Sequence, residues 1–243
     1  MNKLFSVLFL LQFLTSCDHK YKIEGISSVN GLDGKTIFIK SYQNDDWKLL
    51  HSTEVVHGKF SIEGKADSVL MAALFVGNEN IMPIVLEKGN IKISITKAQI
   101  SAKGTVLNDA LYGFFSRRDA IDMQIEELEY KESQMLFRGD DLDDIYTQLS
   151  REYKQLTKEL DNCVKGFISD NYENVLGLNV FIMLCATQPH PIMTPQMENI
   201  LKDAPQSFKS HPTVKEFISK AKENSFNLHN SRQTEQTKLA ETQ

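Results

Sequence analysis

The spacing of apolar residues changes at about Gly104, and this change constrains the fold more than any other feature. From Tyr21 to Gly104, short runs of β-branched and aromatic residues alternate with turn residues, a pattern typical of strands. After Gly104, apolar residues recur every three or four positions, which is the period of an amphipathic helix. The sequence therefore predicts an α+β protein in which the strands come first and the helices follow.

Residues 17–104 are expected to form an antiparallel β domain. Seven apolar runs are separated by turn residues, which favours a β-sandwich or an open barrel. His57-Gly58 joins two of the runs by two residues, as a tight hairpin turn requires. Pro83 lies inside another run, and a proline there places that strand at a sheet edge or at a bulge.

Residues 105–226 are expected to be helical. Two long amphipathic helices are separated by Arg138-Gly139-Asp140-Asp141, and so short a break predicts an antiparallel helical hairpin. Residues 174–187 are apolar on most faces, which predicts a third helix buried by the first two.

Two additional short helices complete the predicted helical region. Thr194-Pro195 is typical of a helix start and predicts a helix over 195–203. Thr213 and Glu216 fit a capping box and predict another helix over 213–224. Residues 227–243 are polar and have little to bury, so a disordered tail is expected there.

Charge and hydropathy limit the classes of partner. The chain has 27 basic and 32 acidic residues, a formal charge of −5, and no basic stripe of the kind that binds nucleic acid. We therefore expect no nucleic-acid partner. Beyond the first 16 residues, no apolar run approaches the roughly 20 residues that a membrane-spanning helix needs.

The first residues, MNKLFSVLFLLQFLTSC, combine Lys3 with an apolar run from Leu4 to Leu14. The run has the length of a signal-peptide core and is too short to span a membrane. The residues up to Cys17 resemble the lipobox of bacterial lipoproteins, an aliphatic residue and two small residues before a cysteine.

This resemblance implies that residues 1–16 form a lipoprotein signal peptide and that Cys17 is lipidated by acyl chains such as palmitate. Two or more chains hold a protein stably on a membrane, whereas one chain binds only marginally. The protein is then expected on the periplasmic side of an envelope membrane or at the cell surface. The alternative is an ordinary cleaved signal followed by an incidental cysteine.

Two further cysteines, Cys163 and Cys185, each lie in a predicted apolar helix and form no C-x-x-C pair. Small core residues are the simplest interpretation, because exchange sites need a thiolate of low pKa near a resolving thiol. An oxidising compartment also permits a disulfide between them, if the two helices touch.

No metal site is predicted. The acidic residues of the run 139–144 lack the alternation of a calcium loop, and they suit the first turn of a helix. His51 and His57 are about 20 Å apart along a strand, too far to share an ion, and His57 is simpler as a turn residue.

No catalytic pattern is found either. The sequence has no phosphate loop, dinucleotide fingerprint or nucleophile elbow, and we expect neither a cofactor nor an enzyme. The aromatic residues Tyr21, Tyr42 and Trp47 could stack on a sugar, although packing within the sheet is the commoner role.

The order of these parts resembles a domain of unknown function from bacterial envelope lipoproteins. The residues that carry the resemblance are Tyr21 to Gly25, the hairpin of Val55, Gly58 and Phe60, and the segments LEKGNIKISI, ENVLG and HPTVKEF. It extends over about residues 17–226. In that family the domain commonly precedes a thioredoxin-like, peroxiredoxin-related domain, whose catalytic Trp-Cys-x-x-Cys signature does not occur in this sequence.

The resemblance also implies that Asp67-Ser68-Val69 is similar to an O-glycosylation acceptor, with a surface turn as the alternative. Together these features predict a lipid-anchored, noncatalytic envelope protein that acts as a binding or scaffolding module. One alternative is an accessory of thiol-disulfide chemistry that works with a separate thioredoxin-like envelope protein. A weaker alternative is glycan binding.

Overall fold

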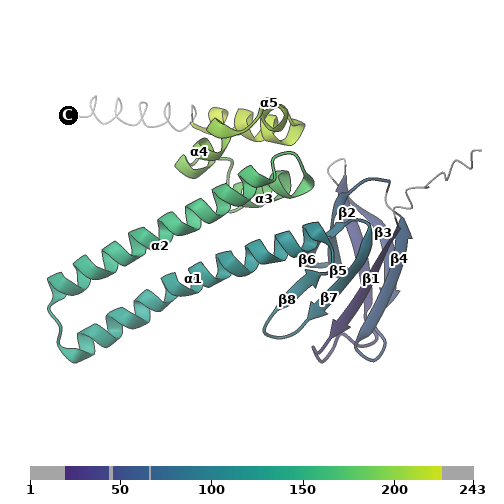
Figure 1. Ribbon diagram of the computed structural model, residues 1–243, viewed down its shortest axis with the longest axis horizontal. Helices are drawn as coiled ribbons and strands as arrows, with labels where there is room; N and C mark the ends of the chain where they lie inside the picture. The colour runs from purple at the N-terminus through teal and green to yellow at the C-terminus, as the bar shows by residue number, and fades with distance from the viewer. Residues whose placement is uncertain (1–19, 44–45, 66, 226–243) are drawn as a thin grey trace, which may run out of the picture.

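The computed structural model describes residues 20–43, 46–65 and 67–225. The predicted signal peptide, Cys17 and the predicted tail from residue 227 lie outside the described residues. Within them the α+β prediction is confirmed, since eight strands form two sheets and helices follow (Figure 1). The two sheets do not close into a barrel.

The first sheet has the strand order β4-β1-β7-β8. Its strands are β4 (Lys59–Lys65), β1 (Lys20–Ser27), β7 (Gly89–Ile95) and β8 (Ile100–Lys103). β1 is antiparallel to β4 but parallel to β7, so the expectation of a wholly antiparallel domain is wrong for this pair. Parallel strands usually read as continuous apolar runs because both their faces are buried, but β1 and β7 bury only one face and so alternate as antiparallel strands do.

The second sheet has the order β3-β2-β5-β6. Its strands are β3 (Asp46–Glu54), β2 (Thr36–Gln43), β5 (Leu70–Val76) and β6 (Glu79–Leu86). Pro83 lies on β6, which is an edge strand, as its missing N–H group predicts.

The core lies between the inner faces of the two sheets and continues into the helices. Ile23 and Ile91 of the first sheet and Ile39 and Leu74 of the second are fully buried in one apolar cluster, which also contains Leu111 of the first helix. Burying each such side chain contributes about 1.5–3 kcal/mol. The strands and those parts of the helices that enter this cluster therefore form one folding unit.

The predicted tight turn at His57-Gly58 is confirmed, but β3 and β4 do not pair as a hairpin, because apart from one isolated bridge between Val56 and Lys59 they belong to different sheets. Val56 and Lys59 exchange backbone hydrogen bonds of 2.9 and 3.0 Å around the turn. His57 and Gly58 have φ angles of 51° and 69°, the left-handed pair that a tight hairpin turn needs. Since β3 and β4 belong to different sheets, this turn carries the chain from one layer to the other.

The predicted helical hairpin is also confirmed. α1 (Val106–Arg138) and α2 (Leu142–Asp170) lie side by side, and the turn between them is far from the sheets (Figure 1). Gly139 ends α1 in the left-handed conformation, with φ of 80°, and its N–H bonds to the carbonyl of Leu136. At 1.5 Å per residue α1 is about 50 Å long, so the hairpin extends well beyond the core.

Four shorter helices pack near the C-terminal end of α2 (Figure 1). They are α3 (Val175–Cys185), α4 (Pro195–Asp203), α5 (Gln206–Lys209) and a helix over 212–225. Thr194 caps α4 as expected, its hydroxyl accepting from the N–H of Met197.

Two details of this region differ from the sequence predictions. α3 contacts α2 and β5, and its Phe181 packs on Phe208 and Phe217, so it is not enclosed between the two long helices. The helix over 212–225 begins before Thr213, and the carbonyl of His211 accepts the first helical hydrogen bond from Lys215. The predicted capping box of Thr213 is therefore wrong, because Pro212 already occupies the first helical position.

Candidate functional site

The hairpin begins at a joint between α1 and the edge strand β6. The side-chain amide of Asn108, which is fully buried, accepts from the N–H of Val85 at 2.9 Å and donates to its carbonyl at 2.8 Å. The same amide nitrogen donates to the hydroxyl of Thr105 at 2.8 Å. Asn108 therefore bonds to both backbone groups of Val85, as a residue of a neighbouring strand would.

Two further side chains hold the start of α1. Glu87, just after β6, accepts from the backbone N–H groups of Leu107 at 2.7 Å and Asn108 at 3.1 Å. It acts as a helix cap supplied from another element, because the side chain of Thr105 caps no backbone N–H group itself. The hydroxyl of Tyr112 donates to the carbonyl of Pro83 at 2.8 Å, and burial raises the pKa of Tyr112.

The far part of the hairpin has few buried side chains. Between Ile121 and Met135 of α1, and between Ile145 and Val164 of α2, no residue is fully buried. Large apolar side chains are exposed there instead, and Phe137 next to the turn is 95% exposed. The other exposed large side chains are Met123, Tyr130, Leu136, Leu142, Tyr146 and Tyr153.

Several of these side chains line a groove of about 510 Å³ between the two helices, which we call the hairpin groove. Leu142 and Tyr146, which line it, are 69% and 75% exposed. Glu129 and Glu132 are the acidic residues that line it. Its full lining is Ile125, Leu128, Glu129, Glu132, Leu136, Leu142, Ile145, Tyr146, Leu149, Ser150 and Tyr153.

One ion pair crosses the hairpin beside the groove. The ammonium of Lys131 on α1 lies 2.6 Å from each carboxylate oxygen of Glu152 on α2. This hydrogen bonding, with a smaller contribution from Gln148, holds the pKa of Glu152 below its ordinary value. The pair joins the two helices where few side chains are buried, and because both groups are partly exposed it contributes at most about 1 kcal/mol.

The same part of the hairpin is strongly acidic. Residues 119–154 contain 11 acidic and 4 basic residues, a formal charge of −7, which leaves +2 for the rest of the chain. Some of this charge has a local role, since Asp141 caps α2 by accepting from the N–H groups of Asp143 and Asp144. This cap confirms that the acidic run 139–144 starts a helix.

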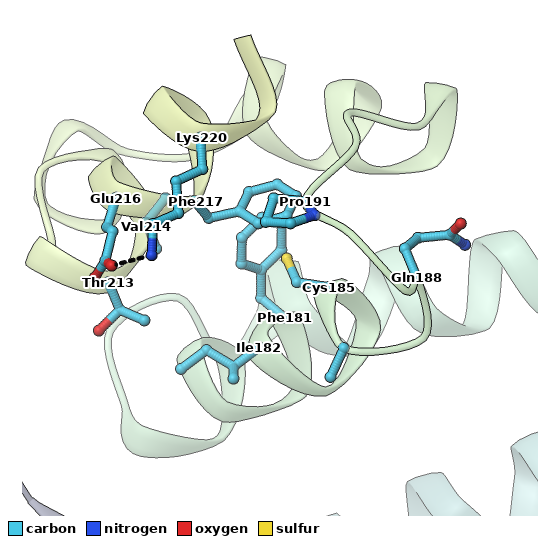
Figure 2. Close-up of a pocket in the computed structure, with 11 residues that line it drawn as sticks. Phe181, Ile182, Cys185, Gln188, Pro191, Thr213, Val214, Glu216, Phe217 and Lys220 are labelled. Atoms are coloured by element: carbon cyan, nitrogen blue, oxygen red, sulfur yellow. Dashed lines mark hydrogen bonds and ion pairs between the residues drawn. The ribbon is translucent and has the colours of Figure 1, made fainter. Parts of the chain in front are cut away.

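Cys185 lines a second cavity, of about 320 Å³, between α3 and the helix over 212–225. Figure 2 shows its sulfur directed toward Pro191 and the rings of Phe181 and Phe217. Burial raises the pKa of Cys185 to about 12, so its thiol stays protonated at neutral pH.

Cys163 lies elsewhere, in a cavity lined by Phe114 and Arg117 of α1. Burial raises its pKa, against a smaller opposing effect of Arg117. Both cysteines are free in the structure, and they line different cavities. The disulfide that an oxidising compartment would permit stays a prediction.

Ser68 lies exposed in a bend between β4 and β5, at the rim of a cavity of about 750 Å³ that Tyr172 and His211 also line. Its hydroxyl is accessible, and its glycosylation stays a prediction.

The three aromatic residues of the sheets that could stack on a sugar, Tyr21, Tyr42 and Trp47, differ in their exposure. Tyr21 is a core residue packed on His51, with 6.0 Å between the ring centroids. Tyr42 and Trp47 are exposed and form an edge-to-face pair 5.4 Å apart. Trp47 also packs on Phe75, with 4.9 Å between the ring centroids. Only Tyr42 and Trp47 of the three predicted aromatics are therefore available to a ligand.

The described residues, 20–43, 46–65 and 67–225, provide neither a metal-binding cluster nor a helix suited to spanning a membrane. No three His, Cys, Asp or Glu side chains among them gather closely enough to hold a metal ion. None of their helices combines the length and hydropathy that a membrane span requires.

The fold thus defines an open two-sheet β unit fastened to a projecting helical hairpin. Residues 21–111 match the family model described as a domain of unknown function (DUF4369). The match runs from β1 through the first turns of α1 and so includes Asn108 of the joint. No curated protein matches the chain.

Sequence reasoning found the hairpin but missed the groove. The apolar periodicity of α1 and α2 predicts amphipathic helices but not which part of each stripe is covered, and no element of the described residues covers the far parts of the two stripes. The excess of acidic residues over 119–154 was a usable signal, because an acidic surface beside exposed apolar residues is typical of a contact site.

Proposed function

We propose that this protein is a lipid-anchored, noncatalytic envelope protein that presents a binding or scaffolding surface to a partner protein. The observation that carries the proposal is the projecting hairpin, on which large apolar side chains stay exposed along both helices. Monomeric proteins seldom expose contiguous apolar surface without a binding role. The resemblance of the residues before Cys17 to a lipobox supports the anchor.

The binding role is tested by site-specific photo-crosslinking in intact cells. A photoreactive residue replaces Tyr146 in the hairpin groove and, in separate variants, Phe137 at the turn and Glu63 on the exposed side of β4. We expect a discrete adduct with one protein from at least one hairpin position and none from Glu63. Absence of adducts from every hairpin position would contradict the binding role.

The anchor is tested separately by labelling with radioactive palmitate. Incorporation of label into the wild-type chain and its loss in Cys17→Ala are expected, with Cys163→Ala as the matched control that keeps the label. Equal labelling of Cys17→Ala would overturn the lipid anchor but leave the binding role standing.

The redox alternative predicts a thioredoxin-like protein as the crosslinked partner. The raised pKa values of Cys163 and Cys185 favour an accessory role over direct thiol chemistry, because exchange proceeds through the thiolate. Full function of a Cys163→Ala, Cys185→Ala double variant would argue against the direct version. Glycan binding would involve Tyr42 and Trp47. The absence of binding to any glycan on an array would contradict this alternative.

A further inference from the structure

The hairpin groove has the dimensions of a binding site for one short helix. Its lining extends over residues 125–136 of α1 and 142–153 of α2, about three helical turns on each side. The apolar residues on the α2 side, Leu142, Ile145, Leu149 and Tyr153, are spaced by three or four positions, so they form one stripe. Two antiparallel helices leave a channel between them that a third helix fills in a bundle.

The charge around the groove specifies the sign of the charge that the bound helix should carry. Glu129 and Glu132 line the groove, and residues 119–154 carry a formal charge of −7. An apolar groove with acidic surroundings is complementary to a helix whose apolar stripe is flanked by Lys or Arg.

The other occupants fit these properties less well. A second copy would bring another hairpin of formal charge −7 against the first. An anionic lipid surface would be repelled in the same way. The chain's own residues 227–243 contain only two leucines and one alanine as apolar residues, too few for a stripe of three turns.

We propose that the hairpin groove binds a basic amphipathic α-helix of a partner protein, with the apolar stripe of that helix against Leu142 and Tyr146. This inference rests on the proposed binding function and names the chemical class of the partner. Binding would cover the apolar surface that the hairpin leaves exposed, while Glu129 and Glu132 select a partner of opposite charge.

The test uses the full-length protein in phosphatidylcholine nanodiscs and three fluorescent peptides of 18 residues. The first has a leucine stripe flanked by lysines, the second has glutamate in place of each lysine, and the third is a scrambled form of the first without a stripe. Fluorescence anisotropy measures binding. We expect the first peptide to bind at least about tenfold more tightly than either other peptide.

Two matched variants locate the binding surface. The double variant Leu142→Ser, Tyr146→Ser removes two exposed groove side chains and should lower the affinity for the lysine peptide about tenfold. The double variant Tyr130→Ser, Phe137→Ser removes two exposed side chains outside the groove and should change binding less than about twofold. Circular dichroism checks that both variants keep their helix content.

A charge reversal provides a readout that does not depend on apolar substitutions. Glu129 and Glu132 are exposed, so Glu129→Lys, Glu132→Lys should leave the fold intact. We expect this variant to bind the lysine peptide with roughly fivefold lower affinity and the glutamate peptide with an affinity higher by a similar factor.

Three results would overturn the inference. They are equal affinity for the three peptides, dimerisation that the Leu142→Ser, Tyr146→Ser variant abolishes, and binding of phosphatidylglycerol vesicles that the same variant abolishes. If the lysine peptide does not bind but photo-crosslinking still yields a partner at hairpin positions, the binding function stands and only the partner class is wrong.

Discussion

Asn108 of α1 is a fully buried polar residue that joins this helix to the edge strand β6. Its side-chain amide makes four hydrogen bonds, two to the backbone of Val85 and one each to Thr105 and Glu87, and it lies within the region that matches the family model. A buried side-chain amide that makes all of its hydrogen bonds stabilises the folded state, whereas a buried backbone group without a hydrogen-bond partner destabilises it. Asn108 therefore stabilises the joint together with Glu87 and Tyr112, and it is the side chain that satisfies both backbone groups of Val85.

We expect Asn108→Ala to lower the free energy of unfolding by about 2–4 kcal/mol, because Val85 would keep a buried N–H and carbonyl without partners. Urea unfolding followed by circular dichroism measures the change. Asn162→Ala on the exposed side of α2 is the matched control and should stay within about 0.5 kcal/mol of wild type. A cost for Asn108→Ala as small as that of the control would show that the joint does not depend on this amide.

Cys185 leads to a prediction about reactivity. An ordinary thiol has a pKa of about 8.5, whereas burial raises the pKa of Cys185 to about 12. At pH 8 the thiolate fraction is therefore lower by about a thousandfold, and alkylation by iodoacetamide should be slower by a similar factor in the folded chain than in urea. Mass spectrometry of the Cys185 peptide measures both rates. A folded-state rate close to the rate in urea would contradict the effect of burial.

At the scale of elements, the turn of the hairpin depends on Gly139. This residue ends α1 with φ of 80°, while Gly113 lies inside α1, and an added Cβ would meet nothing within 4 Å at either position. The two glycines therefore differ in backbone conformation and not in available space.

We expect Gly139→Ala to destabilise the protein by about 1 kcal/mol and Gly113→Ala to stabilise it by about 0.5–1 kcal/mol. Alanine is strained at positive φ but is the better helix former inside α1. Thermal or urea unfolding of the two variants decides the matter, and changes of equal sign would refute the conformational explanation.

Elements were predictable where a local signal specifies them. The change of period at Gly104 and the break at Gly139 predict the strand region and the helical hairpin. Thr194-Pro195 predicts the start of α4. β8 was missed because Ile100–Lys103 is only four residues long. The parallel pairing of β1 with β7 was missed because strand order depends on distant contacts that periodicity does not encode.

At the scale of the whole molecule, stability should be uneven along the hairpin. The first turns of α1 share the core with the sheets through Leu111, Tyr112 and Phe114, whereas residues 122–134 contain no fully buried residue. Segments with few buried contacts open at lower free energy.

Hydrogen–deuterium exchange measured by mass spectrometry should therefore show fast exchange over residues 122–134 and slow exchange over 108–116. Adding the lysine peptide should slow exchange in the first segment and leave the second unchanged, because the groove lies on the distal part. Uniform protection along α1 would contradict this gradient.

The contact between Asn108 and Val85 also has a consequence for self-association. An edge strand with open hydrogen-bonding groups is a template on which another chain can add a strand, and proteins keep such edges covered. At β6, Asn108 and Tyr112 occupy the outward groups of Val85 and Pro83. A variant that loses both side chains would uncover this edge, so it should be prone to sheet-to-sheet aggregation.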